Sequence, residues 1–247
     1  MAPSVHHEDR PPAWRRPTAL EAECACTIWT APPCVPSAAG CYSAAAALVG
    51  RLSAHCLLVE SPAGLILVDT AFGTEDVADP GRLGRQFLTV VRPRLHLART
   101  ALHQIRALGY DPQDVRHIVL THLDLDHAGG ISDFPHARIH VLAEELRAAR
   151  ARSTRAERDR YRPGQWAHGP HWVEHPRDSA TENWYGLQGI PILPRDIPDL
   201  LLVPLPGHSR GHCGLAVRDA DRWLLHCGDA YFSHTDVDPA PRAGRSA

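Results

Sequence analysis

The fold and the chemistry of this chain are decided by the stretch Thr121-His122-Leu123-Asp124-Leu125-Asp126-His127-Ala128-Gly129-Gly130. Four side chains of the metal-binding kind fall within the six residues 122–127, directly after an apolar run at residues 115–121 that we expect to be a strand. Burying two Asp and two His together without a cation leaves charge unpaired, which is costly. The stretch therefore predicts a metal site at the exit of a strand.

The spacing inside the stretch gives each side chain a direction. His122, Asp124 and Asp126 alternate along what we expect to be an extended strand exit, so their side chains point the same way. His127 turns to the neighbouring side. The small residues 128–130 are expected to let the backbone bend sharply.

Three residues elsewhere extend the candidate site. His208 lies in a Pro-Gly-His turn and Asp229 follows an apolar run, both at expected strand ends. We predict that His208 is a ligand and that Asp229 bridges two metals through its two carboxylate oxygens. Asp69 fits a role in orienting a ligand by hydrogen bonding. The alternative for Asp69 is an ordinary turn residue at a strand end.

The remaining sequence indicates a mixed α/β sandwich, because strands alternate with helices and pair as hairpins. Residues 1–25 are rich in Pro, Arg and charge and are expected to be a poorly ordered arm, followed by a domain at 26–232 and a flexible tail at 233–247. Residues 161–198 are expected to be irregular. Strands are expected at residues 54–60, 64–71, 115–121, 137–142, 200–205, 213–218 and 223–227, and helices at 94–108 and 143–160.

The composition limits the classes of partner that the protein is expected to bind. The chain has 247 residues, of which 44% are hydrophobic, and a net charge of -2, so neither a nucleic acid nor an acidic membrane is expected as a partner. No apolar run is long enough to span a bilayer. Seven cysteines, an odd number in a chain of this length, do not predict a disulfide framework. We therefore expect a cytoplasmic protein that acts on a small molecule.

Taken together, the motifs resemble the metallo-β-lactamase superfamily, whose hallmark is His-x-His-x-Asp-His after a strand. The resemblance runs from about residue 54 to residue 232, and it looks closest to the branch containing acyl-homoserine-lactone lactonases. The motifs that carry it are Leu67-Val68-Asp69-Thr70, residues 121–130, Pro206-Gly207-His208-Ser209-Arg210-Gly211-His212 and Gly228-Asp229.

The resemblance implies an αββα sandwich of two mixed β-sheets, with helices on the outer faces and a metal site at the edge between the sheets. Two divalent ions are implied, with zinc expected and manganese or iron as alternatives. A water between them would be the nucleophile, with its pKa lowered by the cations. The implied ligands are His122, Asp124 and His208 for one metal and Asp126 and His127 for the other, with Asp229 bridging. Asp126 is also expected to orient the nucleophile and manage its proton.

Two features depart from the family pattern. Asp124 stands where the hallmark has its second histidine, which makes the site richer in oxygen and its bound water less acidic. The family also has a later histidine, well downstream of the bridging Asp, whereas only a short tail follows Asp229 here. His234 is too close to Asp229 to take that place, so we expect a sandwich that lacks its C-terminal elements.

The function expected from these residues is hydrolysis of a small-molecule ester, lactone or thioester by a metal-bound hydroxide. Two alternatives stay open: a truncated chain with weak or no activity, and an iron-dependent sulfur dioxygenase-type member. Tyr231 is expected to stabilise a developing oxyanion, with packing on the sheet as its alternative. The aromatic stretch 161–198 is expected to form an apolar wall for an acyl chain. The residues expected in this wall are Trp166, His168, His171, Trp172, Trp184 and Tyr185.

Overall fold

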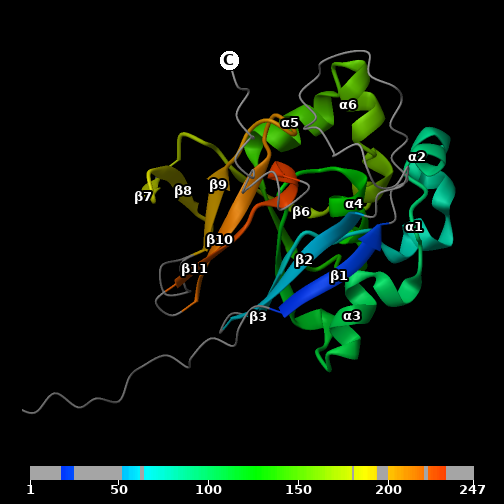
Figure 1. Cartoon of the computed structure of the whole chain (residues 1–247), viewed down its shortest axis with the longest axis horizontal. Coiled ribbons are helices and arrows are strands. Elements are labelled where there is room, and N and C mark those ends of the chain that lie inside the picture. Colours follow the sequence, from blue (N-terminus) through cyan, green and yellow to red (C-terminus); the bar gives the residue numbers. More distant parts are fainter. Residues whose placement is uncertain are drawn as a thin grey trace, which may run out of the picture.

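The computed structural model describes residues 18–24, 52–61, 64–179, 181–193, 200–219 and 222–231. Two β-sheets lie face to face, and helices cover the outer side of the first sheet (Figure 1). The sandwich predicted from the sequence is therefore confirmed. Residues 18–24 form strand β1, although we expected them in the poorly ordered arm; the rest of that arm and the tail at 233–247 lie outside the described residues.

The first sheet has the strand order β1-β2-β3-β4-β5-β6. The first three strands pair antiparallel, and β3 to β6 run parallel. Parallel neighbours bring their carboxyl ends to one edge of the sheet, where sites form in α/β folds. The strands are β1 (Thr18–Cys24), β2 (Leu52–Ser61), β3 (Gly64–Val68), β4 (Val115–Val119), β5 (Arg138–Leu142) and β6 (His171–His175).

The second sheet is antiparallel throughout, in the order β11-β10-β9-β8-β7, where a mixed sheet was expected. Residues 161–198, expected to be irregular, contain three strands. The sequence did not predict β6 because this strand is defined by its parallel pairing with β5, which lies more than 30 residues earlier in the chain. The strands are β7 (Glu182–Trp184), β8 (Leu187–Pro191), β9 (Leu200–Pro204), β10 (Cys213–Asp219) and β11 (Arg222–His226).

The helices are shorter than the apolar spacing predicted. The expected helix at 94–108 begins only at Ala101, because the Thr100 side chain accepts a hydrogen bond from the His103 amide and caps the helix there. No helix in the described part of the chain is both long and apolar enough to cross a membrane. The α-helices are α1 (Thr74–Ala78), α2 (Arg85–Val90), α3 (Ala101–Ala107), α4 (Leu125–Ala128), α5 (Ala143–Ala151) and α6 (Arg155–Arg160), and the 3-10 turns are η1 (Pro80–Leu83), η2 (Leu97–Arg99), η3 (Pro112–Asp114), η4 (Gly129–Asp133), η5 (Pro163–Trp166) and η6 (Gly228–Ala230).

The single helix expected at 143–160 is two helices, α5 and α6. Arg152 ends α5 in a left-handed conformation with φ of 44°. Thr154 and Glu157 then form a capping box that starts α6 in a new direction. This break places the end of α6 beside the loop that carries Asp124.

The core has two main layers because neighbouring strand residues face opposite ways. In β2, Leu58 packs with the helices, whereas Leu57 and Val59 pack between the sheets. The layer between the sheets is completed by apolar residues of β8, β9 and β10, including Ile190, Leu202 and Leu215. Burial of both layers fixes the sheets against each other and leaves their common edge for polar loops.

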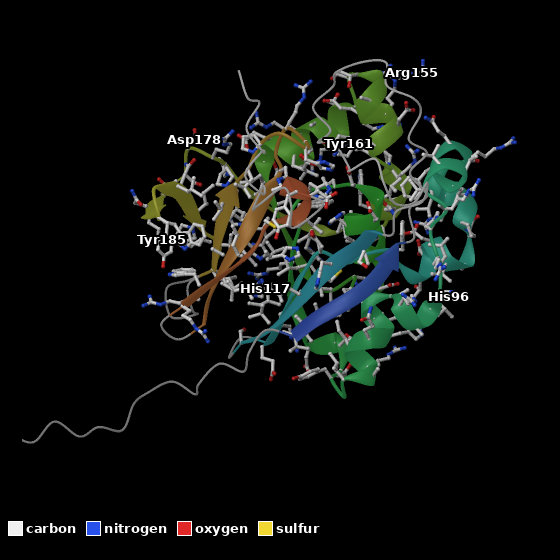
Figure 2. The ribbon with its side chains drawn as sticks, in the orientation of Figure 1. His96, His117, Arg155, Tyr161, Asp178 and Tyr185 are labelled. Carbon is white, nitrogen blue, oxygen red and sulfur yellow. The ribbon has the colours of Figure 1, made fainter. Side chains whose placement is uncertain are left out.

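Three histidines interrupt this apolar layer with a hydrogen-bonded row. His117 Nδ1 lies 2.9 Å from His140 Nε2, and His140 Nδ1 lies 3.0 Å from His175 Nε2. They come from the adjacent strands β4, β5 and β6, and His117 lies between the two sheets (Figure 2). Burial lowers the pKa of His140 to about 3. Burial also lowers the pKa of His117 and of His175, so the row is neutral at ordinary pH.

We predict that His140 makes the fold sensitive to acid. An unfolded histidine titrates near pH 6.5, so between about pH 6.5 and 3 the unfolded chain binds a proton that the folded chain rejects, and stability falls as the pH falls. One such proton changes the free energy of unfolding by at most about 1.4 kcal/mol per pH unit. Urea unfolding of His140→Gln, with metal chelated, should show a shallower loss of stability over this range.

The control is His171→Gln, because His171 is exposed at the start of β6. It should keep the pH dependence of the parent chain. A His140→Gln variant with an unchanged slope would contradict the prediction.

Candidate metal centre

The edge of the sandwich collects five of the six predicted metal ligands. His122 follows β4, Asp124 directly precedes α4 and His127 lies within α4. His208 lies in the loop between β9 and β10, and Asp229 in η6 after β11. The five side chains form two groups that share His122, and in each group the potential ligand atoms lie within 4.8 Å of one another.

The first group consists of His122, Asp124 and His208. Asp124 Oδ2 lies 3.0 Å from His208 Nε2 and 3.4 Å from His122 Nε2. Ligand atoms around a tetrahedral zinc ion, each about 2.0–2.1 Å from the metal, are separated by about 3.3 Å. The spacing therefore fits donors arranged around one ion.

The second group consists of His122, His127 and Asp229. Asp229 Oδ1 lies 3.2 Å from His127 Nε2, while Oδ2 lies 3.9 Å from His122 Nε2 and 3.5 Å from His208 Nε2. The two oxygens of Asp229 thus face different histidines, one on each side. This is the arrangement that a carboxylate bridging two ions needs.

The hydrogen bonds of His122 leave one nitrogen free for a metal. The Thr121 hydroxyl donates to Asp69 Oδ2, so it accepts from His122 Nδ1 at 2.9 Å. That bond puts the His122 proton on Nδ1 and a lone pair on Nε2. His122 is fully buried, and its Nε2 has no hydrogen-bond partner within the described residues. A buried acceptor directed at carboxylate oxygens fits a bound cation.

The negative charges around His127 also favour a bound cation. Burial by itself lowers the pKa of His127, but the carboxylates of Asp69, Asp229 and Asp126 raise it well above the ordinary range. Burial by itself raises the pKa of Asp229, but the nearby histidines outweigh this effect and lower it to about 2. Without a metal, a proton on His127 balances the negative charge of these carboxylates. Divalent ions bound at the same place would supply that positive charge instead.

Asp126 is the predicted ligand that stands apart. Within the described residues it belongs to neither group, and it lies in α4 rather than on an extended strand exit. The expected alternation fails because the helix begins at Leu125, and side chains two residues apart do not share a face of a helix. Burial raises the pKa of Asp126, and the charges of Asp229 and Asp124 act in the same direction.

Asp69 makes the contact that its predicted role requires. It is fully buried, and its Oδ2 accepts a hydrogen bond from His127 Nδ1 at 2.9 Å. Its Oδ1 accepts from the Thr121 amide at 2.8 Å. Asp69 has φ of 53°, a left-handed conformation that residues other than glycine rarely adopt and that clusters at functional sites. The strained backbone turns the carboxylate from the end of β3 toward β4.

The glycines after the ligand stretch serve close packing rather than a sharp bend. Gly129 has ordinary helical angles, so our expectation of a bend permitted by glycine was wrong. A Cβ on Gly129 would lie 2.7 Å from the Ala71 carbonyl, and one on Gly130 would lie 2.7 Å from that of Thr70. The absent side chains let the loop after β3 lie against the ligand stretch.

Glu145 is a supporting residue that the sequence reasoning missed, because the charged helix read as a solvated face. It is fully buried at the start of α5. Its Oε1 accepts from the Leu123 amide at 3.0 Å and the Tyr161 hydroxyl at 3.1 Å. Its Oε2 accepts from the Ser209 hydroxyl at 2.7 Å and the Gly211 amide at 2.9 Å. Glu145 thus joins the loop of His122 and Asp124 to the loop of His208.

His212 supports Asp229 in a similar way. Its Nδ1 donates to the Leu205 carbonyl at 2.9 Å, and its Nε2 accepts from the Asp229 amide at 3.0 Å. Burial lowers the pKa of His212 to about 4, so the ring is neutral and can accept that bond. The only sequence signal was its place in the motif at residues 206–212.

The aromatic residues predicted to contact substrate do not form one wall. Trp172 packs against the core under the helices, whereas Trp184 packs against Trp223 on the outer side of the second sheet. Tyr231 follows η6 and is 44% exposed. The expectation of a shared apolar wall was therefore wrong, because the chain between the two tryptophans crosses from one sheet to the other.

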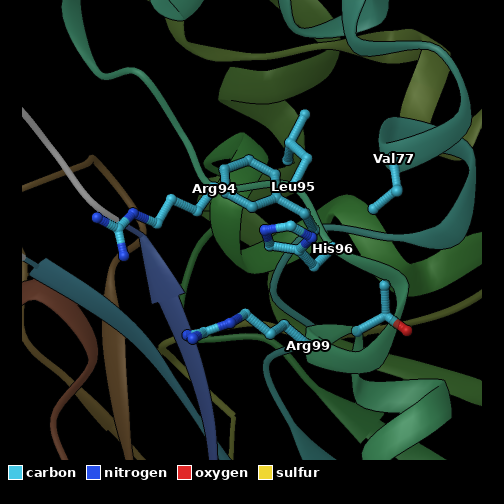
Figure 3. Close-up of a pocket in the computed structure, with 7 residues that line it drawn as sticks. Val77, Arg94, Leu95, His96 and Arg99 are labelled. Atoms are coloured by element: carbon cyan, nitrogen blue, oxygen red, sulfur yellow. The ribbon is translucent and has the colours of Figure 1, made fainter.

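Two surface pockets differ in the size of the molecule that they can hold. The pocket in Figure 3 lies between α1 and the segment before α3, and its volume of about 10 Å³ suffices for about one water molecule. A wider recess of about 390 Å³ opens beside His208, with Arg160 and Tyr161 in its wall. That volume falls in the range of small-molecule sites. The recess also reaches Ala156, Glu157, Pro206, Gly207, Ser209 and Arg210.

Comparison with known proteins gives concordant matches. The family profile described as the metallo-β-lactamase superfamily matches residues 49–245. A probable metallo-hydrolase of Mycobacterium tuberculosis is 52% identical over 187 residues, 76% of this chain and 59% of that protein. N-acyl homoserine lactonase AttM of Agrobacterium fabrum is 30% identical over 164 residues, 65% of this chain and 58% of that protein. The chain thus spans less than two thirds of the length of these curated relatives.

The fold also matches solved structures. An N-acyl homoserine lactone hydrolase, solved with the product N-hexanoyl-L-homoserine bound at its catalytic metal centre, superposes with a TM-score of 0.67. The alignment covers 95% of this chain and 83% of that one at 22% sequence identity. At this identity the likeness establishes the fold alone.

We predict that removing the Glu145 carboxylate destabilises the whole edge. Glu145→Ala leaves four donors without their acceptor, and we expect the free energy of unfolding to fall by at least about 3 kcal/mol in urea titrations. The matched control is Glu144→Ala, whose partner Arg147 is 67% exposed. The control should lose less than about 1 kcal/mol. Equal losses in the two variants would refute this role of Glu145.

Proposed function

Because the chain belongs to the metallo-β-lactamase superfamily, we propose that it is a metal-dependent hydrolase that cleaves an ester, lactone or thioester bond of a small molecule. Membership in the family confirms the resemblance carried by the four sequence motifs. The activity and the substrate class are proposals that rest on the site.

The observation that carries the proposal is that Asp229, a member of the second group, also faces His208 of the first group. Its oxygens face His127 on one side and His122 and His208 on the other. Together with the unpartnered Nε2 of His122, this supports two divalent ions joined by one carboxylate. We infer zinc for both, with manganese or iron as alternatives, because nitrogen and carboxylate ligands suit all three metals.

The ions would supply Lewis acidity, which lowers the pKa of water and polarises a substrate carbonyl. The protein supplies the orientation. Asp69 fixes the ring of His127, and His212 fixes the backbone of Asp229. Asp126, whose charge acts on His127, is proposed to complete the second group and to accept the proton released by the nucleophile.

A small-molecule substrate is supported by the recess beside His208. Its wall reaches one member of the first group, so a bound molecule would present its scissile bond to that group. Among small molecules we favour lactones, because a relative 30% identical to this chain is named an N-acyl homoserine lactonase. Tyr231, exposed two residues after Asp229, is proposed to contact the substrate. The cytoplasmic location stays a prediction.

We predict about two zinc ions per chain and hydrolysis of at least one compound in a panel of lactones, thioesters and simple esters. Asp229→Asn keeps the side-chain shape but removes the charge that both groups use. It should lower the metal content to one ion or fewer and the kcat/KM by at least about 100-fold. Elemental analysis and initial rates give both readouts.

Exposed His171 provides the control, and His171→Ala should keep metal and rate. An Asp229→Asn variant that retains two ions and full activity would contradict the bridging role. A single iron per chain with oxygen uptake in the presence of a persulfide would replace hydrolysis by the redox alternative.

A further inference from the structure

Asp124 has a partner that a histidine at this position would not need. Arg160, the last residue of α6, directs its Nη1 at Asp124 and lies 3.0 Å from each carboxylate oxygen. The Asp124 side chain is 17% exposed and that of Arg160 is 28% exposed. Within the described residues, this is the only arginine that pairs with a carboxylate of either group.

The geometry leaves Asp124 able to bind a metal at the same time. Nη1 is equidistant from the two oxygens, so it lies between them at the outer end of the carboxylate. The two histidines of the first group approach Oδ2 instead. A carboxylate has about four lone-pair positions, so arginine and a metal can share it.

Arg160 is held in place by its neighbours along α6. The Thr154–Glu157 capping box fixes the start of the helix, with the Thr154 amide 2.9 Å from Glu157 Oε2. Tyr161, the next residue after Arg160, is buried and anchored on Glu145. Arg160 thus lies between two fixed points, and its placement depends on the break between α5 and α6.

Charge explains why such a partner is useful. The neutral histidine of the family hallmark adds no charge, whereas Asp124 adds one negative charge beside Asp126 and Asp229. The guanidinium cancels that charge and holds the carboxylate in one orientation. The pair therefore offers a metal a fixed ligand with the same net charge as histidine.

We propose that Arg160 is a positioning residue for the first metal, and that Asp124 and Arg160 together replace the histidine of the family hallmark. The inference rests on the proposed metal-binding function. Its test is a double-mutant cycle built from Arg160→Met, Asp124→His and the combined variant. Competition with a chromophoric chelator measures the Zn²⁺ dissociation constants, and the absorption spectrum of the Co²⁺-loaded chain reports the ligand set.

Each single variant should bind Zn²⁺ about 10–100-fold more weakly at the first group. Arg160→Met frees the Asp124 carboxylate to move, and Asp124→His leaves the Arg160 charge unpaired beside the cations. The combined variant should return to within about 3-fold of the parent chain. Its Co²⁺ spectrum should change toward a ligand set with one more nitrogen.

Two further variants guard against a trivial loss of folding. Arg155→Met changes an arginine of the same helix that is 89% exposed, and it should bind Zn²⁺ like the parent chain. Arg160→Lys keeps the charge without the planar group, and it should bind more tightly than Arg160→Met. Thermal unfolding of each metal-free variant identifies any that does not fold.

The outcomes separate this inference from the proposed function. A parent chain that binds neither Zn²⁺ nor Co²⁺ overturns both. A parent chain that binds metal, with Arg160→Met binding equally well or with additive losses in the combined variant, overturns the Asp124–Arg160 pairing and leaves the metal site intact.

Discussion

The buried carboxylate of Asp69 holds the two central strands together at the edge where the ligands lie. It accepts hydrogen bonds from the amide and hydroxyl of Thr121 and from the ring of His127. A carboxylate with no exposed surface is stable only when its charge is matched, and here burial is outweighed by His127 and His226, which keep its pKa well below the ordinary range. The positions of His122 and His127 both follow from this one anchor.

Glu145 performs the corresponding task on the side of His208. Two buried acids thus fix the ligand loops from outside the ligand set, one from the turn after β3 and one from the start of α5. Each makes hydrogen bonds to backbone amides, so loop shape as well as side-chain position is determined. A site assembled in this way is formed before a cation binds, which lowers the entropy lost on binding.

Electrostatic repulsion among acidic side chains opposes the assembly of this edge of the sandwich. Asp124, Asp126 and Asp229 lie close enough for their charges to affect one another, and burial of all three is unfavourable without positive charge. The histidines supply part of it, and Arg160 supplies a full charge from a separate helix. The bend between α5 and α6 therefore matters for the charge balance of the site, because it places Arg160 beside Asp124.

The sequence alone was sufficient for the family and the two-sheet sandwich, because the stretch at residues 121–130 is local and its residue types have few other uses together. Of the six residues that it predicted as ligands, five lie together in the structure. It did not show that α4 begins at Leu125 and separates Asp126 from Asp124. Nor did it identify Glu145, His212 or Arg160, whose partners lie 7 to 66 residues away along the chain. Periodicity and composition describe neighbours in sequence, whereas a buried carboxylate acquires its role only when packing brings distant donors to it.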